Sequence, residues 1–236
     1  MGINSNISWC DSSWNPWHGC KKVSQGCKFC YMYRDKARYG QNPEIVTRSK
    51  PATFNAPTKW KDARLIFTCS WSDWFIAEAD NWREEAWEII KRTPQHTYQI
   101  LTKRPERIKE HLPGDWSNGY QNVWLGVSVE DAAAKSRIDE LRQVPAQVRF
   151  LSVEPLLSEV TPVSLLGIDW VIVGGESGPD HRLMDLQHAR NVRDACLTQG
   201  VPFFFKQVGG TRPSSKGDLL DGVQWQQMPG QTAEVM

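Results

Sequence analysis

The stretch Arg64-Leu-Ile-Phe-Thr-Cys69-Ser-Trp-Ser-Asp73 joins a short apolar run to a polar end, and this pattern recurs along the chain. A short apolar run bounded by polar residues is typical of a buried strand. The segment that follows, about Asp80 to Lys91, repeats its apolar residues at helical spacing and predicts a helix. From residue 64 onward, the sequence therefore predicts strands that alternate with helices.

Six or seven such strand–helix units can be counted. The further predicted strands are Thr97–Leu101, Asn122–Val127, Gln147–Leu151, Asp169–Val173 and Val201–Phe205, the helices between them are Pro105–His111, Asp131–Gln143 and Asp185–Thr198, and a short first strand lies near Ile7–Cys10. Because strands joined through helices form parallel sheets with right-handed crossovers, we predict an α/β fold, a partial or nearly closed (βα)6-7 barrel. A doubly wound parallel sheet is the alternative.

The barrel is predicted to span residues 1–208 as one domain, since a chain of 236 residues that is 40% hydrophobic can bury a full core. A long polar segment at about 40–60 contains prolines and indicates an insertion or lid. Residues 209–236 are rich in Gly, Pro, Ser and Gln, and are predicted to form a C-terminal extension.

Composition predicts a cytoplasmic protein, because the first residues do not resemble a signal peptide and no apolar run is long enough to span a membrane. In a reducing compartment, six cysteines favour metal binding or catalysis over disulfides. The net charge of +1 predicts no general attraction to polyanions. Between Lys21 and Arg64, however, eleven basic residues face three acidic ones, which indicates either a solvated surface or a rim that binds phosphates.

Three cysteines lie close together in a predicted loop at 17–31, whose sequence is Trp17-His-Gly-Cys20-Lys-Lys-Val-Ser-Gln-Gly-Cys27-Lys-Phe-Cys30-Tyr31. Three thiolates can hold three irons of a [4Fe-4S] cluster and leave the fourth iron open for chemistry. The alternative is a zinc site, in which His18 or Cys10 would complete a set of four ligands.

Polar or charged residues follow six successive predicted strands. They are Cys69–Trp74, Thr102–Arg104, Ser128–Glu130, Ser152–Pro155, Gly174–Gly178 and Lys206–Gln207. Any one of them could be a cap or a turn, as Ser128 could be. Because catalytic residues of βα barrels gather at the carboxyl ends of the strands, the set as a whole predicts an active face there.

These features together resemble the radical S-adenosylmethionine (SAM) superfamily, in which a three-cysteine loop follows the first barrel strand and an aromatic residue precedes the third cysteine, as Phe29 does here. The spacing differs, because six residues separate Cys20 from Cys27 where the usual pattern has three. The chain is most similar to a phage-associated family with this widened motif, which also carries Trp14-Asn-Pro16 and Gly174-Gly-Glu-Ser-Gly178. The resemblance covers about Ile7 to Gln207.

The resemblance implies that Cys20, Cys27 and Cys30 hold the cluster and that SAM is cleaved to a 5′-deoxyadenosyl radical, which abstracts hydrogen from the substrate. By position, the residues implied to bind SAM are Phe29, Ser70, Ser72, Asp73, Ser128 and Glu130. The residues implied to orient substrate or to move protons are Lys103, Glu154, Glu176 and Lys206. The superfamily's usual role for Gly-Gly-Glu does not carry over to Glu176, because here the motif follows the sixth strand. Cys69 would return a hydrogen atom to a product radical, or is a buried core thiol.

The implied substrate is linked to nucleic acid, and one specific expectation is the isomerisation of an amino-acid-modified thymine in phage DNA. Such a base would have to be flipped out of the duplex or presented single-stranded. A free nucleotide or a tRNA is the alternative substrate. The implied partners are an electron donor and a three-Cys-motif partner protein, and the host cytoplasm is the implied location if a phage encodes the chain. The alternative function is a zinc-binding structural or nucleic-acid-binding module without SAM chemistry.

Overall fold

The computed structural model describes residues 3–213 and 215–231 and is a mixed α/β protein. The chain divides into two compact units. The first contains the residues up to Val23 together with 32–126 and 143–147. The second contains 24–31, 127–142 and the residues from Val148 onward.

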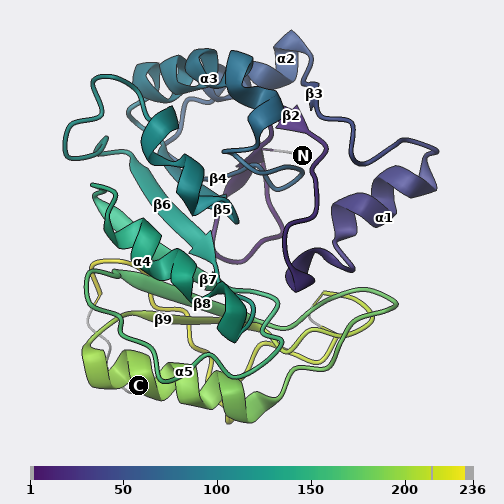
Figure 1. The fold of residues 1–236 in the computed structure, drawn as a ribbon, viewed down its shortest axis with the longest axis vertical. Coiled ribbons are helices and arrows are strands. Elements are labelled where there is room, and N and C mark those ends of the chain that lie inside the picture. Colours follow the sequence, from purple (N-terminus) through teal and green to yellow (C-terminus); the bar gives the residue numbers. More distant parts are fainter. Residues whose placement is uncertain (1–2, 214, 232–236) are drawn as a thin grey trace. The chain divides into compact units, whose positions relative to one another are not determined.

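Parallel strands form the centre of the first unit (Figure 1). In their order in the sheet they are β1 (Ser12–Trp14), β4 (Leu65–Thr68), β5 (Thr97–Thr102) and β6 (Val123–Ser128), of which the last two residues belong to the second unit. β1 pairs in parallel with β4, and β4 with β5, so that Ser12 lies beside Ile66 and Leu65 beside Thr97. The apolar runs at β4 and β5 form strands because they can be buried on both faces of a parallel sheet.

Aromatic side chains fill the core of the first unit. Trp14, Trp17 and Trp74 are almost completely buried, and the ring centroids of Trp17 and Trp74 are 5.0 Å apart. Trp87 on α3 (Asp80–Arg92) packs edge-on against Trp74, because the apolar face of that helix turns inward. The remaining elements are β2 (Trp17–His18), α1 (Tyr31–Arg38), β3 (Thr47–Arg48) and α2 (Pro51–Phe54).

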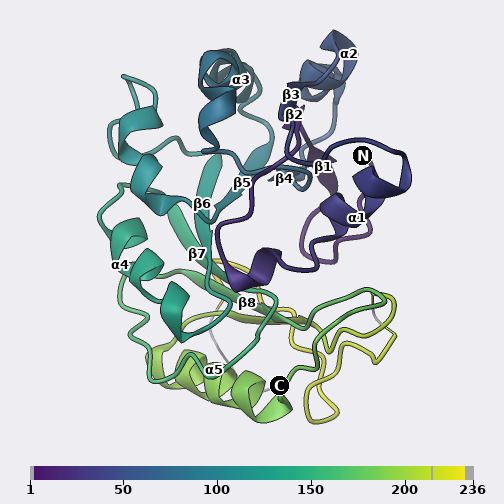
Figure 2. The ribbon, with the colours of Figure 1, turned by 45° about the vertical axis from the view of Figure 1, so that its right-hand side comes forward.

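Parallel strands also form the centre of the second unit, where the end of β6 is followed by β7 (Val148–Val153), β8 (Trp170–Gly174) and β9 (Phe203–Gln207). β7 pairs in parallel with β8, and β8 with β9. Helix α4 (Ser136–Arg142) packs against β7, and α5 (Leu186–Gln199) packs against β8 and β9 (Figure 2). The side chain of Asp185 caps the start of α5, and Gly200, with φ of 69°, ends it.

Part of the predicted C-terminal extension packs against β9. The N–H of Phe205 donates to the carbonyl of Trp225 at 2.8 Å, and the N–H of Phe203 donates to the side-chain oxygen of Gln227 at 2.9 Å. The indole of Trp170 donates to the carbonyl of Gln227 at 2.8 Å. These hydrogen bonds attach residues 225–227 to the second unit, whereas the end of the predicted extension, residues 232–236, lies outside the described residues.

The predicted α/β fold with a parallel sheet is confirmed. In each unit the neighbouring strands follow one another in the chain without a reversal, apart from the β2–β3 pair, which forms a separate antiparallel sheet. A doubly wound sheet reverses its strand order, whereas a βα barrel winds in one direction, so the observed order is that of a barrel-type fold.

Three predicted elements differ from the observed ones. The first strand is Ser12–Trp14 rather than Ile7–Cys10, because Ile7–Cys10 forms a turn in which the N–H of Cys10 donates to the carbonyl of Ile7 at 3.2 Å. The segment Pro105–His111 forms two short 3₁₀ turns instead of a helix. The helix predicted from Asp131 begins with a 3₁₀ turn, which the carboxylate of Asp131 caps at the N–H of Ala134.

The segment predicted as an insertion or lid contains β3 and α2. β3 pairs antiparallel with β2, and Phe54 is fully buried. The indole of Trp14 donates to the carbonyl of Phe54 at 3.0 Å. Within the described ranges, none of the helices is both long and apolar enough to cross a bilayer.

Candidate functional site around the cysteine loop

The cysteine loop is divided between the two units. Cys20 belongs to the first unit, and Cys27 and Cys30 belong to the second. The six cysteines of the chain all lie among the described residues, and none of them forms a disulfide. Cys27 is buried and ends a 3₁₀ turn, and the N–H of Cys30 donates to its carbonyl at 3.4 Å.

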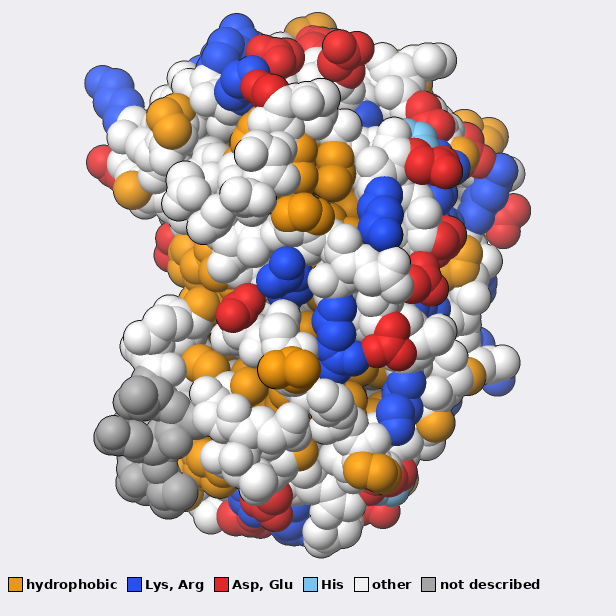
Figure 3. Space-filling view, turned by 60° about the vertical axis from the view of Figure 1, so that its left-hand side comes forward, with side chains coloured by type: hydrophobic (Ala, Val, Ile, Leu, Met, Phe, Trp, Pro, Cys, Tyr) orange, Lys and Arg blue, Asp and Glu red, His pale blue; other side chains and the backbone are white. Residues whose placement is uncertain are grey.

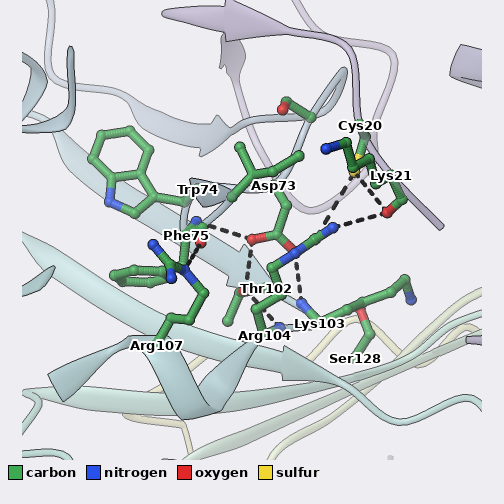
Figure 4. A network of polar contacts seen from close by, with 12 residues as sticks. Cys20, Lys21, Asp73, Trp74, Phe75, Thr102, Lys103, Arg104, Arg107 and Ser128 are labelled. Carbon is green, nitrogen blue, oxygen red and sulfur yellow. Dashed lines mark hydrogen bonds and ion pairs between the residues drawn. The ribbon is translucent and has the colours of Figure 1, made fainter. Parts of the chain in front are cut away.

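In the first unit, a buried ion pair holds the segment that contains Cys20 (Figure 4). The guanidinium of Arg104 lies 3.0 Å from the carboxylate of Asp73, and both side chains are more than nine-tenths buried. The same guanidinium donates to the carbonyl of Lys21 at 2.8 Å and points its Nη1 at the Sγ of Cys20 at 3.9 Å. A cation beside a sulfur atom stabilises the thiolate, which is the form that binds metals.

The carboxylate of Asp73 accepts four contacts from the chain. Oδ1 accepts hydrogen bonds from the hydroxyl of Thr102 at 2.6 Å and the N–H of Phe75 at 2.9 Å. Oδ2 accepts from the N–H of Lys103 at 2.9 Å and faces Arg104. Burial by itself lowers the pKa of Arg104, but the neighbouring Asp73 and Cys20 raise it overall, so the guanidinium stays charged. Asp73, predicted to bind SAM, therefore holds Arg104 and the end of β5.

The loop after β4 is also tied to the residues before Cys20. The amide of Asn15 donates to the hydroxyl of Ser70 at 2.9 Å and accepts from the N–H of Trp71 at 2.7 Å. The hydroxyl of Ser72 donates to the carbonyl of Gly19 at 2.6 Å, and the N–H of Gly19 donates to the carbonyl of Trp71 at 3.0 Å. The Trp-Asn-Pro motif thus positions the chain next to the first cysteine, and the hydroxyls of Ser70 and Ser72 take part in these bonds.

Cys69 is a buried thiol at the end of β4. It is 4% exposed, and burial first, then the negative charge of Asp73, raise its pKa well above the usual value. The thiol therefore keeps its proton at neutral pH. A neutral S–H group is the form that both predicted roles require, hydrogen-atom donor or core thiol.

In the second unit, Glu130 holds the segment Ser24–Cys27. Its side chain is completely buried, and Oε1 accepts from the hydroxyl of Ser24 at 2.7 Å while Oε2 accepts from the guanidinium of Arg137 at 2.7 Å. A Cβ at Gly26 would come within 2.5 Å of the Cγ of Glu130, so only glycine fits there. Glu130 is one of the residues predicted to bind SAM, and in the structure its carboxylate anchors the loop that carries Cys27. Ser128 is buried, and its carbonyl accepts from Arg137 at 2.7 Å.

Glu176 of the Gly-Gly-Glu motif holds the same segment through Arg182. The carboxylate of Glu176 accepts from the Nη2 of Arg182 at 2.6 Å, from its Nε at 2.8 Å and from its N–H at 2.9 Å. Arg182 in turn donates to the carbonyl of Gln25 at 3.0 Å, and its guanidinium lies 5.3 Å from the ring centroid of Phe29. The aromatic residue of the cysteine motif is therefore held by a charged pair from the end of β8.

We expect Glu176→Gln to destabilise the protein at pH 7 and the difference from the wild type to shrink in acid. Burial alone would raise the pKa of Glu176, but the hydrogen bonds from Arg182 lower it below the ordinary 4.5. A lowered pKa adds stability above pH 4.5 that disappears as the pH falls through the folded-state value. Urea unfolding at pH 7 and at pH 4 measures this difference. An equal difference at both values would contradict it.

Glu154 and Lys206, both predicted to act on the substrate, form an ion pair of 2.9 Å in the second unit. The pair can form because residue 174 is a glycine, since a Cβ at this position would lie 2.4 Å from the Oε1 of Glu154. The following glycine, Gly175, lies close to the residue after β9, because a Cβ at this position would be 2.0 Å from the carbonyl oxygen of Val208. Both glycines of the motif are thus required by close packing.

Within the described ranges, 3–213 and 215–231, no three His, Cys, Asp or Glu side chains form a group that could hold an ion. The two residues predicted as a fourth zinc ligand have other contacts in the first unit. The thiol of Cys10 lies 3.4 Å from the hydroxyl of Ser5, and a ring nitrogen of His18 lies 3.1 Å from the hydroxyl of Thr47. These contacts do not favour the zinc alternative.

The basic segment Lys21–Arg64 is partly neutralised within the first unit. Lys21 pairs with Glu78, and Arg48 pairs with Glu85 at 2.6 Å. On the face drawn in Figure 3, basic and acidic side chains are interspersed rather than gathered in areas of one sign. The ion pairs of Lys21 and Arg48 are compatible with the solvated-surface interpretation for these two residues.

Sequence reasoning missed the residues that connect the predicted ones. They are Asn15, Ser24, Gly26, Arg104, Arg137, Gly174 and Arg182. Five of them lie within predicted motifs or strand ends: Asn15 in Trp-Asn-Pro, Ser24 and Gly26 in the cysteine loop, Arg104 after Thr102, and Gly174 in Gly-Gly-Glu-Ser-Gly. No sequence pattern predicts a role for Arg137 or Arg182, because each acts through a carboxylate, Glu130 or Glu176, that comes near only in the folded chain.

The family model of DUF5131, a protein of unknown function, matches residues 4–229 of this chain. No curated protein and no solved structure matches it.

Proposed function

We propose that this chain, which belongs to the DUF5131 family, is a radical SAM enzyme that modifies or isomerises a substrate linked to nucleic acid. Cys20, Cys27 and Cys30 would supply three thiolate ligands to a [4Fe-4S] cluster in a barrel of the radical SAM type. With SAM and one electron from a donor protein, such a cluster supplies reductive cleavage to methionine and a 5′-deoxyadenosyl radical. An amino-acid-modified thymine in DNA is the proposed substrate.

The observation that carries the proposal is the way in which charged strand-end residues hold the cysteine loop. Arg104, fixed by Asp73, contacts the segment of Cys20. Glu130 holds Ser24, and Arg182, fixed by Glu176, holds the next residue of that segment. Burying ion pairs costs desolvation energy, so a buried pair is weak evidence of added stability, and we infer that these pairs specify the position of the loop. These pairs support a loop whose thiols must be held in place.

Other residues support chemistry at the strand ends. Lys206 donates from Nζ to Oε1 of Glu154, and a substrate anion that displaced this carboxylate would receive that N–H. Cys69 keeps its proton on Sγ because burial raises its pKa, so it can offer a hydrogen atom to a product radical. Lys206 would orient the substrate and Cys69 would quench a product radical. Neither side chain is needed to hold the cysteine loop.

Anaerobic reconstitution tests the proposal. We expect the wild-type chain to bind about four irons per chain, as a [4Fe-4S] cluster requires, and to form 5′-deoxyadenosine from SAM with a strong reductant. Cys27→Ala is expected to lose both properties, because two thiolates do not hold this cluster. Cys196→Ala is the matched control, since Cys196 is a fully buried thiol on α5 outside the motif. Stoichiometric zinc without an iron–sulfur absorption band, or equal iron in Cys27→Ala and the wild type, would overturn the proposal.

A further inference from the structure

Lys36 on α1 is a buried cation without a counter-ion. Only 4% of the residue is exposed. In the part of the chain that the structure describes, its ammonium makes no hydrogen bond and no ion pair. The buried arginines differ, since Arg83 pairs with Asp80 at 2.6 Å and Arg104 pairs with Asp73. A lysine is almost never this buried unless it is paired, so Lys36 requires an explanation beyond packing.

The ammonium of Lys36 can be reached from outside although the rest of the side chain is covered. Among the described residues, the fully enclosed polar atoms without a partner belong to six other residues, and Nζ of Lys36 is not one of them. A lysine often buries its aliphatic stem and leaves the head accessible in this way. The charge is therefore placed where a ligand can approach it.

A second lysine lies near the turn of α1 that precedes Lys36. One turn before Lys36, the hydroxyl of Tyr33 donates to the carbonyl of Cys20 at 2.5 Å. The ammonium of Lys22 lies 4.6 Å from the ring centroid of Tyr33. The surroundings thus place positive charge beside the first half of the cysteine loop and favour an anion there.

We propose that Lys36 binds a phosphate group of a nucleotide or a nucleic-acid backbone. Lysine acts as a point-charge ligand for phosphate, and a ligand that carries repeated phosphates would also use the excess of basic residues between Lys21 and Arg64. This inference rests on the proposed function for the identity of the substrate. The anion site itself needs no cluster and no SAM.

Binding of a fluorescein-labelled single-stranded oligothymidylate to the full-length chain, followed by anisotropy, tests this site. We expect Lys36→Met to raise the Kd about ten- to hundredfold, as for a lost hydrogen bond to a charged group, and to reduce the salt dependence by about one phosphate contact. Lys36→Arg, which keeps the cation, is expected to retain most of the affinity. Lys109→Met removes an exposed lysine of the first unit that lies outside residues 21–64, and it is expected to leave the Kd unchanged.

The folded state of Lys36→Met should survive, because the substitution removes a charge that has no counter-ion among the described residues and keeps the length of the side chain. Its melting temperature is expected to equal or exceed that of the wild type. An unchanged Kd in Lys36→Met, or an equal loss in Lys109→Met, would overturn the site. The site would also be overturned if Lys36→Met lowered the affinity for thymidine, which has no phosphate, as much as it lowered the affinity for the oligothymidylate. The binding assay requires no cluster. If Lys36→Met leaves the Kd unchanged while the wild type still forms 5′-deoxyadenosine, only the anion site is overturned. If Lys36→Met weakens binding but the wild type forms no 5′-deoxyadenosine, only the proposed enzyme is overturned.

Discussion

Arg104→Met is expected to lower the free energy of unfolding by about 3 kcal/mol, the low end of the range for a buried ion pair that loses one partner. The variant leaves the carboxylate of Asp73 buried without its counter-ion. The loss stays at the low end because Asp73 keeps hydrogen bonds from Thr102, Phe75 and Lys103. Urea unfolding followed by tryptophan fluorescence measures it.

Lys91→Met is the matched control for Arg104→Met. Lys91 forms an ion pair with Asp115, but both side chains are about half exposed, and exposed pairs contribute little. We expect almost no change in this variant. Asp73→Asn combined with Arg104→Met should recover part of the lost stability, because the remaining buried charge is then removed. Equal unfolding energies for Arg104→Met and Lys91→Met would show that the buried pair does not hold this part of the fold.

Gly175→Ala is expected to cost about 3 kcal/mol, the upper part of the usual range for overpacking. The new Cβ would lie 2.0 Å from the carbonyl oxygen and 2.7 Å from the carbonyl carbon of Val208. Both atoms belong to the backbone, so the chain beyond β9 would have to move away from β8. Thermal and urea unfolding measure the cost.

Alanine substitutions at two other glycines give comparison values for the stability cost of Gly175→Ala. Gly114→Ala is the control, since a Cβ there meets nothing within 4 Å and the glycine has no positive φ. Gly174→Ala should fall between the two variants, because its nearest obstacle is the carboxylate end of Glu154, which can rotate away. A rotation of Glu154 would break its pair with Lys206, so this variant should affect any activity more than it affects stability. If Gly175→Ala and Gly114→Ala were equally stable, the close approach would not limit this position.

Much of the fold could be predicted from local patterns. The strands β4, β5, β7, β8 and β9 overlap the predicted ones, because apolar runs of this length have few other ways to be buried. The prediction failed where local sequence is ambiguous, as at Pro105–His111, whose short segment forms 3₁₀ turns instead of a helix. The first strand was placed too early because Ser12 is polar, although its hydroxyl is satisfied by the carbonyl of Ile3 at 2.6 Å.

The candidate site could be predicted by residue type more readily than by role. Both Glu130 and Glu176 are predicted strand-end carboxylates, but in the structure Glu130 accepts a hydrogen bond from Ser24 and Glu176 acts on that segment only through Arg182. Lys36 had no signal beyond its place in a basic run, because burial without a partner is a property of the folded chain alone.

The α/β class, the order of the strands and the thiols of the cysteine motif follow from the amino-acid sequence, because hydrophobic periodicity and residue spacing are local properties. Which charges meet depends on the fold instead. Arg104 joins Asp73 across 31 positions of the chain, and Glu130 joins Ser24 across 106. A side chain's partner depends on which strand ends lie next to each other, and that is settled when the sheet forms rather than by any neighbour in sequence.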